Sequence, residues 1–94
     1  MQDQTVSILK AIADDIRVAI VRKLMDHDEL GTQDFIKKMT ISQPTLSHHL
    51  AILLDSHILN ARKEGVLWRY SLNKTYLKKI GIDMKKLAHA KHAH

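Results

Sequence analysis

The chain of 94 residues contains no cysteine, one proline and three glycines, and it has no long apolar run. The absence of cysteine excludes disulfides, thiolate metal ligands and thiol-based redox sensing. No stretch approaches the ~20 apolar residues that a membrane-spanning helix needs, and no apolar N-terminal segment resembles a signal peptide. We therefore expect a cytoplasmic protein that does not insert into a membrane.

Proline and glycine are too sparse to form a linker, and no repeat or low-complexity tract divides the sequence. We expect a single domain over residues 1–94, which at this size buries only about 60 to 65% of the surface that its unfolded chain exposes. Contact between two copies would bury more, so a homodimer is expected. The chain also lacks a glycine-rich phosphate loop, a nucleophile beside a base and paired acids in an apolar setting. Neither an enzyme nor a bound cofactor is expected.

Acidic residues are in the minority, because ten of them face fifteen lysines and arginines, which gives a net charge of +5. This excess has the sign that a polyanionic partner such as DNA requires. A soluble basic protein with no such partner could carry the same charge. The charge therefore permits a nucleic-acid partner but does not select one.

The segment from 40 to 55 carries the strongest structural signal. Ser42 is a favourable N-cap, and Pro44 falls in the first turn, where a missing N–H costs no intrahelical hydrogen bond. Four leucines follow at spacings of four, three and one, which predicts a helix with one buried face. The four are Leu46, Leu50, Leu53 and Leu54.

The opposite face of this predicted helix carries short, mostly uncharged groups that form hydrogen bonds. Glutamine pairs bidentately with adenine, serine and threonine bond to most base edges, and the threonine methyl meets the thymine methyl. The pattern therefore predicts a helix that reads bases in double-stranded DNA, although a solvated helix rich in serine and threonine is the alternative. The residues of this face are Gln43, Thr45, Ser47 and His48.

A second short helix is predicted just before this one. Thr32 is a suitable N-cap, and Phe35, Ile36 and Met39 supply an inward face. Only three residues, Thr40 to Ser42, separate the two helices. This spacing predicts a helix-turn-helix, with an ordinary corner between two helices as the alternative.

After Ser56 the apolar period changes from about 3.6 to about 2 residues, which predicts two strands. The pair Glu64-Gly65 supplies the turn between them, so the strands form a hairpin directly after the predicted recognition helix. Such a hairpin is a wing, and its cations could reach phosphates or the minor groove, unless they serve solvation alone. The cations are Arg62, Lys63 and Arg69.

The two ends of the chain are predicted to be helical arms. The first helix begins near Thr5, and Asp14 caps a second helix that ends near His27. From Thr75 a last helix follows, with Gly81 as an interruption. The predicted inward residues are Val6, Leu9, Ile12 and Ala13 in the first helix, Ile16, Ala19, Ile20 and Leu24 in the second, and Tyr76, Leu77, Ile80, Met84 and Leu87 in the last.

The first and last helices show more apolar surface than a lone winged helix can cover. We therefore expect residues 1–13 and 75–94 to be dimerisation arms that pair across a two-fold axis. The predicted fold class is mostly α with a β-hairpin wing (α+β). It is a winged helix-turn-helix with elements in the order α-α-α-α-β-β-α, in which the fourth helix is the recognition helix.

Three segments together resemble the ArsR family of bacterial winged-helix repressors. They are IADDIRVAIVRKL at residues 12–24, ISQPTLSHHLAIL at 41–53 and EGVLWRYSLN at 64–73. The resemblance covers most of residues 9–73, and it is as close to the small metal-independent autorepressors as to the metal sensors. It implies a homodimer that binds an inverted repeat in an operator and blocks transcription, often of its own operon.

The resemblance also assigns roles to residues of this chain. The opening of the recognition helix, residues 42–49, matches the family segment that meets the major groove. The hairpin matches the wing of the family. His49 holds the histidine of the family's Ser-x-His-Leu motif. The implied DNA-binding residues are Ser42, Gln43, Pro44, Thr45, Ser47, His48 and His49 on the helix, with Arg62, Lys63 and Arg69 on the wing.

Three departures from the family pattern are visible. The common Asp-Pro-Thr-Arg sequence reads Asp-Asp-Ile-Arg at residues 14–17. Thr40 stands where many members have glycine in the helix-turn-helix turn, and a β-branched residue is strained in a left-handed conformation, so a differently shaped turn is expected. The cysteine metal box of the third helix is absent, because residues 31–34 read Gly-Thr-Gln-Asp.

Histidines near the C-terminus leave a metal-responsive alternative open. His89 and His92 would share a helix face, so two antiparallel copies could offer four imidazoles to one zinc or nickel ion. The family's sensors of this type place an aspartate and a further histidine upstream, where this chain has Tyr76 and Lys78. We expect no metal site. A winged helix that binds a protein is the other alternative, and an effector, either a protein or a small molecule, is left open.

Overall fold

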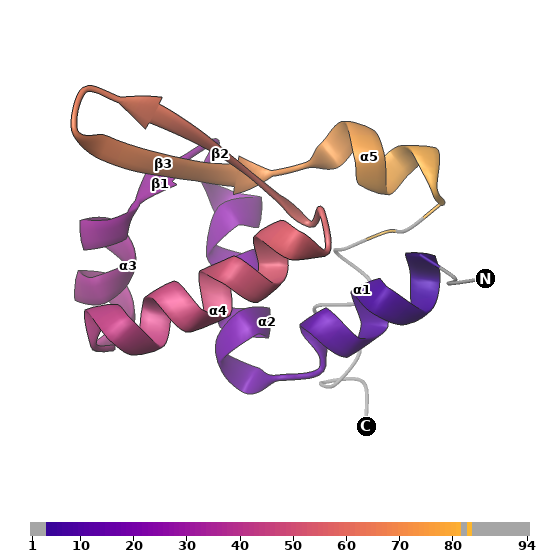
Figure 1. Cartoon of the computed structure of the whole chain (residues 1–94), viewed down its shortest axis with the longest axis horizontal. Coiled ribbons are helices and arrows are strands. Elements are labelled where there is room, and N and C mark those ends of the chain that lie inside the picture. The colour runs from indigo at the N-terminus through magenta and orange to yellow at the C-terminus, as the bar shows by residue number, and fades with distance from the viewer. Residues whose placement is uncertain (1–3, 82, 84–94) are drawn as a thin grey trace.

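The computed structural model describes residues 4–81 and residue 83. Over these residues the chain forms five helices and a three-stranded antiparallel sheet (Figure 1), which confirms the predicted winged helix-turn-helix. No helix in this part of the chain is long and apolar enough to span a membrane. The elements are α1 (Gln4–Ile12), α2 (Asp15–Asp26), β1 (Leu30–Gly31), α3 (Thr32–Met39), α4 (Gln43–Asp55), β2 (Leu59–Glu64), β3 (Leu67–Leu72) and α5 (Lys74–Lys79).

The recognition helix α4 lies across the core. Its N-cap is Ser42, as predicted, and three of its four leucines are buried while Leu54 is only partly buried. Just after the helix, His57 adopts the left-handed conformation. The N–H of His57 donates to the carbonyl of Leu54, and the N–H of Ile58 donates to the carbonyl of Leu53. This pair of bonds is a Schellman motif, which fixes where α4 stops.

The buried faces of α1 and α2 differ from the prediction. Val6 and Leu9 are 48% and 44% exposed, and Ile8 and Ala11 are buried instead. Ile12 is buried as predicted, whereas Ala13 lies exposed just after the helix. Val6 and Leu9 therefore lie on the outer side of α1 and account for the apolar surface left uncovered there. In α2 the capping role of Asp14 is confirmed, but the predicted inward residues Ile16 and Ala19 are only partly buried. The buried residues of α2 are Val18, Ile20, Val21 and Leu24.

The start of α3 also differs by one residue. Gly31 is the N-cap, and Thr32 is the first helical residue. The carboxylate of Asp34 accepts a hydrogen bond of 2.8 Å from the N–H of Gly31, which ties the first turn back to the cap. Leu30 and Gly31 also form β1, which pairs with β3 and was not predicted, so the sheet has the order β1-β3-β2.

The wing follows the predicted hairpin closely. Strands β2 and β3 pair from Leu59 opposite Leu72 to Glu64 opposite Leu67, which leaves Gly65 and Val66 as a two-residue turn. Gly65 has φ of 65°, a conformation that glycine adopts without strain and that such short hairpin turns require.

The last described helix, α5, starts at Lys74, one residue before the predicted start. It begins after the N-cap Asn73, whose side chain accepts from the N–H of Tyr76, and it ends at Lys79. Gly81 has φ of 80° and interrupts the helix, as predicted. The predicted positions Met84, Leu87, His89 and His92 lie outside the described residues.

The turn between α3 and α4 keeps the left-handed conformation despite its threonine. Thr40 has φ of 51° and ψ of 52°, so the expectation of a differently shaped turn was wrong. A left-handed conformation costs a residue with a Cβ about 1–2 kcal/mol. The packing of α3 against α4 imposes this geometry, and Thr40 carries the strain.

Thr40→Gly is therefore expected to stabilise the fold. Removal of the strain outweighs the extra unfolded-state entropy of glycine by up to about 1 kcal/mol, which corresponds to a rise in Tm of roughly 4–8 °C. Thermal unfolding followed by circular dichroism measures the change in Tm. Thr75→Gly, in α5, is the control and should lower Tm because that position is helical. A lower Tm for both variants would show that Thr40 is not strained.

Candidate nucleic-acid interface

The first two turns of α4 present a polar face to solvent. Gln43, Pro44, Thr45, Ser47 and His48 are exposed, as their predicted role requires. Ser42 is exposed as well. Its hydroxyl donates a 2.9 Å hydrogen bond to the hydroxyl of Thr45 and accepts from the Thr45 N–H, so it orients one member of this face while it caps the helix.

His49 does not belong to this face. It is only 8% exposed, because it shares the inner side of α4 with Leu46, Leu50 and Leu53. The prediction that His49 contacts DNA therefore does not fit its position. Its ring lies instead against α2, where Nδ1 is 3.1 Å from Nη1 of Arg17 and 3.7 Å from Oδ2 of Asp14.

Arg17 joins three helices through its guanidinium group. Its Nε donates to the carbonyl of Ala11 at the end of α1, and its Nη1 faces His49 on α4, while its own backbone belongs to α2. Asp14 completes the junction, because its carboxylate caps α2 and lies near both His49 and Arg17. No sequence pattern marked Arg17 for this role. The junction sets the orientation of the recognition helix relative to α1.

The protonation state of His49 follows from this environment. Burial lowers the pKa of His49, the carboxylate of Asp14 partly offsets that effect, and the nearby charge of Arg17 adds to the lowering. Burial raises the pKa of Asp14, but the backbone hydrogen bond from Arg17 and the neighbouring charges outweigh it, so the net pKa is lowered. The Nδ1 of neutral His49 accepts a hydrogen bond from Arg17. If the ring were protonated, Nδ1 would also be a donor, and two donors and two positive charges would face each other.

A stability loss at mildly acidic pH is the expected result. A histidine whose folded-state pKa is lowered stabilises the fold fully above its unfolded pKa of ~6.5, and this contribution is lost as the pH falls through the folded value. Tm should therefore drop between about pH 7.5 and pH 5.5. His49→Asn keeps an acceptor without titrating and should flatten the drop, whereas His48→Asn should leave it in place. Equal profiles for the wild type and His49→Asn would contradict this role.

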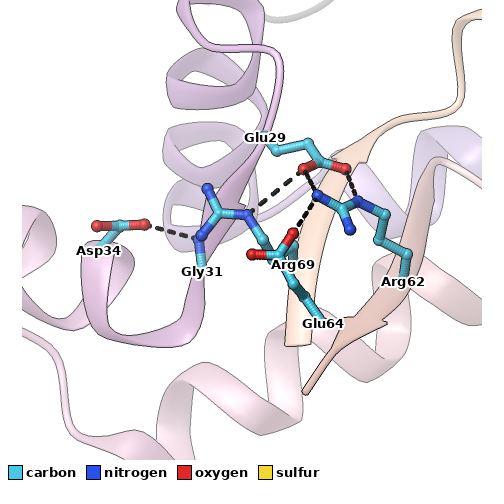
Figure 2. A network of polar contacts seen from close by, with 6 residues as sticks. All are labelled: Glu29, Gly31, Asp34, Arg62, Glu64 and Arg69. Carbon is cyan, nitrogen blue, oxygen red and sulfur yellow. Dashed lines mark hydrogen bonds and ion pairs between the residues drawn. The ribbon is translucent and has the colours of Figure 1, made fainter. Parts of the chain in front are cut away.

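The wing arginines are held by carboxylates (Figure 2). Arg62 donates to both oxygens of Glu29 at 2.6 and 2.7 Å and to Glu64 at 2.8 Å. Arg69 lies 3.4 Å from the same Glu29 carboxylate. The hydrogen bond from Arg62 lowers the pKa of Glu29, and Glu29 followed by Glu64 raises that of Arg62. Glu29, which no sequence pattern marked as a site residue, therefore ties both strands of the wing to the segment before β1.

A cleft separates the wing from the start of α3. Its volume is about 360 Å³, and Gln43 at the start of α4 contributes to its wall. Within the described residues no group of three or more His, Cys, Asp or Glu side chains could hold a metal ion. His89 and His92 lie outside those residues, and the absence of a metal site there stays a prediction.

Comparison with known proteins agrees with this geometry. Residues 14–61 match the profile of the bacterial regulatory proteins of the arsR family. The chain belongs to the ArsR family. Among its family relatives, the arsenical resistance operon repressor of Staphylococcus xylosus is 38% identical over 83% of this chain and 74% of its own length. The transcriptional repressor SdpR of Bacillus subtilis is 34% identical over 76% of this chain and 78% of its own length.

A solved ArsR-like structure shares the whole architecture. HlyU from Vibrio cholerae superposes with a TM-score of 0.79 at 33% identity, over 97% of this chain and 94% of that chain. The family match and these relatives make this chain a DNA-binding transcriptional regulator and give no indication of an enzyme. HlyU of V. cholerae bears the name transcriptional activator, so the relatives of this chain include both named repressors and a named activator.

Proposed function

We propose that this ArsR-family regulator is a cytoplasmic, homodimeric repressor that binds an inverted-repeat operator, including one at its own gene, without a metal. The observation that carries the proposal is the exposed face of uncharged hydrogen-bonding side chains at the start of α4, above a buried leucine stripe. A helix face that is only solvated more often carries lysine and glutamate. Uncharged hydrogen-bonding side chains are better suited to contact with base edges. We assign base contact to Gln43, Pro44, Thr45, Ser47 and His48.

Dimerisation through α1 and α5 is supported by the placement of these helices. The Tyr76 hydroxyl donates a 2.7 Å hydrogen bond to Gln4, so α5 is fastened to α1. Val6 and Leu9 leave an apolar strip exposed on α1. Figure 1 shows α1 and α5 at the opposite end of the molecule from the turn between β2 and β3 and the start of α4. A dimer through the arms therefore leaves both recognition helices uncovered.

The test is to pass fragmented genomic DNA over metal-stripped protein and to sequence the retained fragments. An inverted repeat upstream of its own gene is expected. A reporter fused to that fragment should be expressed more strongly when the protein is absent, and weaker expression would make the protein an activator. Retention only after zinc or nickel is added would favour the metal-responsive alternative. No enrichment under either condition would favour the protein-binding alternative.

The dimer is tested separately by sedimentation equilibrium. A mass of two chains at micromolar concentration is expected, and Leu9→Lys should shift it toward one chain, since it places a charge in the apolar strip. A stable monomer of the wild-type chain would contradict an operator with two-fold symmetry.

A further inference from the structure

One side chain joins the arm that we assign to dimerisation to the helix that we assign to base reading. Arg17 lies on α2, and its Nε donates to the carbonyl of Ala11 in the last turn of α1. Its Nη1 lies 3.1 Å from Nδ1 of His49, in the middle of α4. His49 is on the buried side of that helix. Arg17 therefore lies behind the recognition helix, away from the face that meets DNA.

The hydrophobic core also connects α1 to α4, but it does so without direction. Ile8 of α1 and Leu50 and Leu53 of α4 are buried in the same cluster. Apolar contact is non-directional, so it holds two helices together while it leaves their relative tilt weakly defined. A guanidinium group presents its donors in a fixed planar fork. Arg17 therefore adds direction to a contact that the core alone leaves free to tilt.

The surroundings of His49 hold the fork of Arg17 in place. Asp14 accepts hydrogen bonds from the N–H groups of Ile16 and Arg17 at 2.9 and 3.1 Å, and its Oδ2 is 3.7 Å from Nδ1 of His49. The ring of His48, on the same helix as His49, is the third titratable or charged neighbour, with the two ring centroids 5.1 Å apart. Because Nδ1 accepts only when the ring is neutral, the junction in this form requires neutral His49.

A small tilt of α4 displaces the base-reading residues considerably. Gln43 precedes His49 by six residues, or about 9 Å along the helix, so a tilt of about 10° at His49 moves Gln43 by roughly 1.6 Å. Binding groups must be held within about 0.5 Å of their working geometry. In a two-fold dimer both helices tilt. The distance between them then changes by up to about 3 Å, close to the rise of one base pair, about 3.4 Å.

We propose that Arg17 is a positioning residue that fixes the distance between the two recognition helices of the dimer, and so determines which spacing of the two half-sites is accepted. This inference rests on the proposed function, including the dimer through α1 and α5. Arg17 makes no base contact, and each half-site is read by the face that begins at Gln43. Selectivity for bases and selectivity for spacing therefore come from different residues.

The probes are duplexes that carry the selected inverted repeat, the same repeat with its spacer one base pair longer or shorter, and one half-site alone. One base pair turns a half-site by about 34–36° around the duplex, so the wild type should prefer the selected spacing by about tenfold or more. Arg17→Met keeps an unbranched apolar side chain and removes its donors. It should lower this preference about threefold or more and leave the affinity for one half-site unchanged, as anisotropy titrations measure.

Lys23→Met is the matched control, because it removes a positive charge from the last turn of the same helix, α2. It should change the affinities for all of these duplexes by the same factor. The preference for the selected spacing should therefore stay at the wild-type value.

The pH provides a second measurement that needs no variant of Arg17. Between about pH 7.5 and pH 5 the wild-type spacing preference should fall, since a protonated His49 cannot accept from Arg17. His49→Asn keeps an acceptor that does not titrate and should retain its preference over the same range. Protonation of the exposed His48 strengthens binding to every duplex and cancels in the ratio. This series decides the question even if Arg17→Met does not fold.

The outcomes distinguish this inference from the proposed function. If Arg17→Met keeps the wild-type spacing preference, or weakens the binding of every duplex by one factor, Arg17 does not set the spacing and the DNA-binding function stands. Equal spacing preferences of the wild type and His49→Asn at about pH 5 would also overturn the inference. If the wild type binds none of the duplexes at any salt concentration, the proposed function fails together with the inference.

Discussion

Binding to the selected operator should weaken about 10³- to 10⁵-fold when the salt concentration is raised from about 50 to 200 mM. This loss is expected for a dimer that neutralises about 6–10 phosphates, because each contact releases condensed counterions from the duplex. Partners that are proteins rarely show so steep a dependence. Fluorescence anisotropy of a labelled duplex across a salt series measures the slope. A nearly flat series would contradict phosphate contact and favour the protein-binding alternative.

The salt slope also tests the state of the wing arginines. Glu29→Gln removes the carboxylate charge that Arg62 and Arg69 share, so Arg69 becomes available to a phosphate, while Arg62 keeps Glu64 as its partner. The slope should then steepen by about 0.9 for each new contact, and random DNA should be bound more tightly. Asp28→Asn changes the net charge equally at a neighbouring exposed residue and is the control. A change of the same size in both variants would mean that net charge alone is responsible.

The recognition helix was predictable because its signals are local. The cap at Ser42, the proline in the first turn and the leucine spacing all lie within one segment. They predicted the N-cap and three of the four buried residues of the helix. The hairpin was predictable for the same reason, since Gly65 and the two-residue period lie in neighbouring sequence. Strand β1 was not predictable, because its two residues are too few to show an alternating pattern and its partner β3 lies far along the chain.

The site was predicted less completely than the fold, and the misplaced residues show why. His49 stands three residues after Leu46 and four before Leu53, so its spacing alone indicated the buried face. Its polarity and its place in the family motif favoured DNA instead. Arg62 was placed on the wing correctly, but Glu29 is 33 residues away in sequence, and no spacing rule shows that the two side chains meet. Sequence patterns locate elements, whereas ion pairs between elements depend on how those elements pack.

Replacing Gln43 with alanine should weaken operator binding by about 1–3 kcal/mol per half-site and relax the sequence preference at one position. Gln43 is exposed in the first turn of α4, and its amide offers both a donor and an acceptor to one base edge. Adenine is the base that such a pair favours. Anisotropy titrations on the operator, on operators changed at one base pair and on scrambled duplex measure both effects.

Gln33→Ala is the matched control, because it removes another exposed glutamine from the first turn of α3 and not from the recognition helix. It should change the affinities for operator and scrambled duplex by the same factor. Gln43→Ala should instead lower the ratio between these two affinities. If Gln43→Ala also leaves that ratio unchanged, Gln43 does not read a base. Specificity must then come from Thr45, Ser47 or His48, or from the sequence-dependent cost of deforming the duplex.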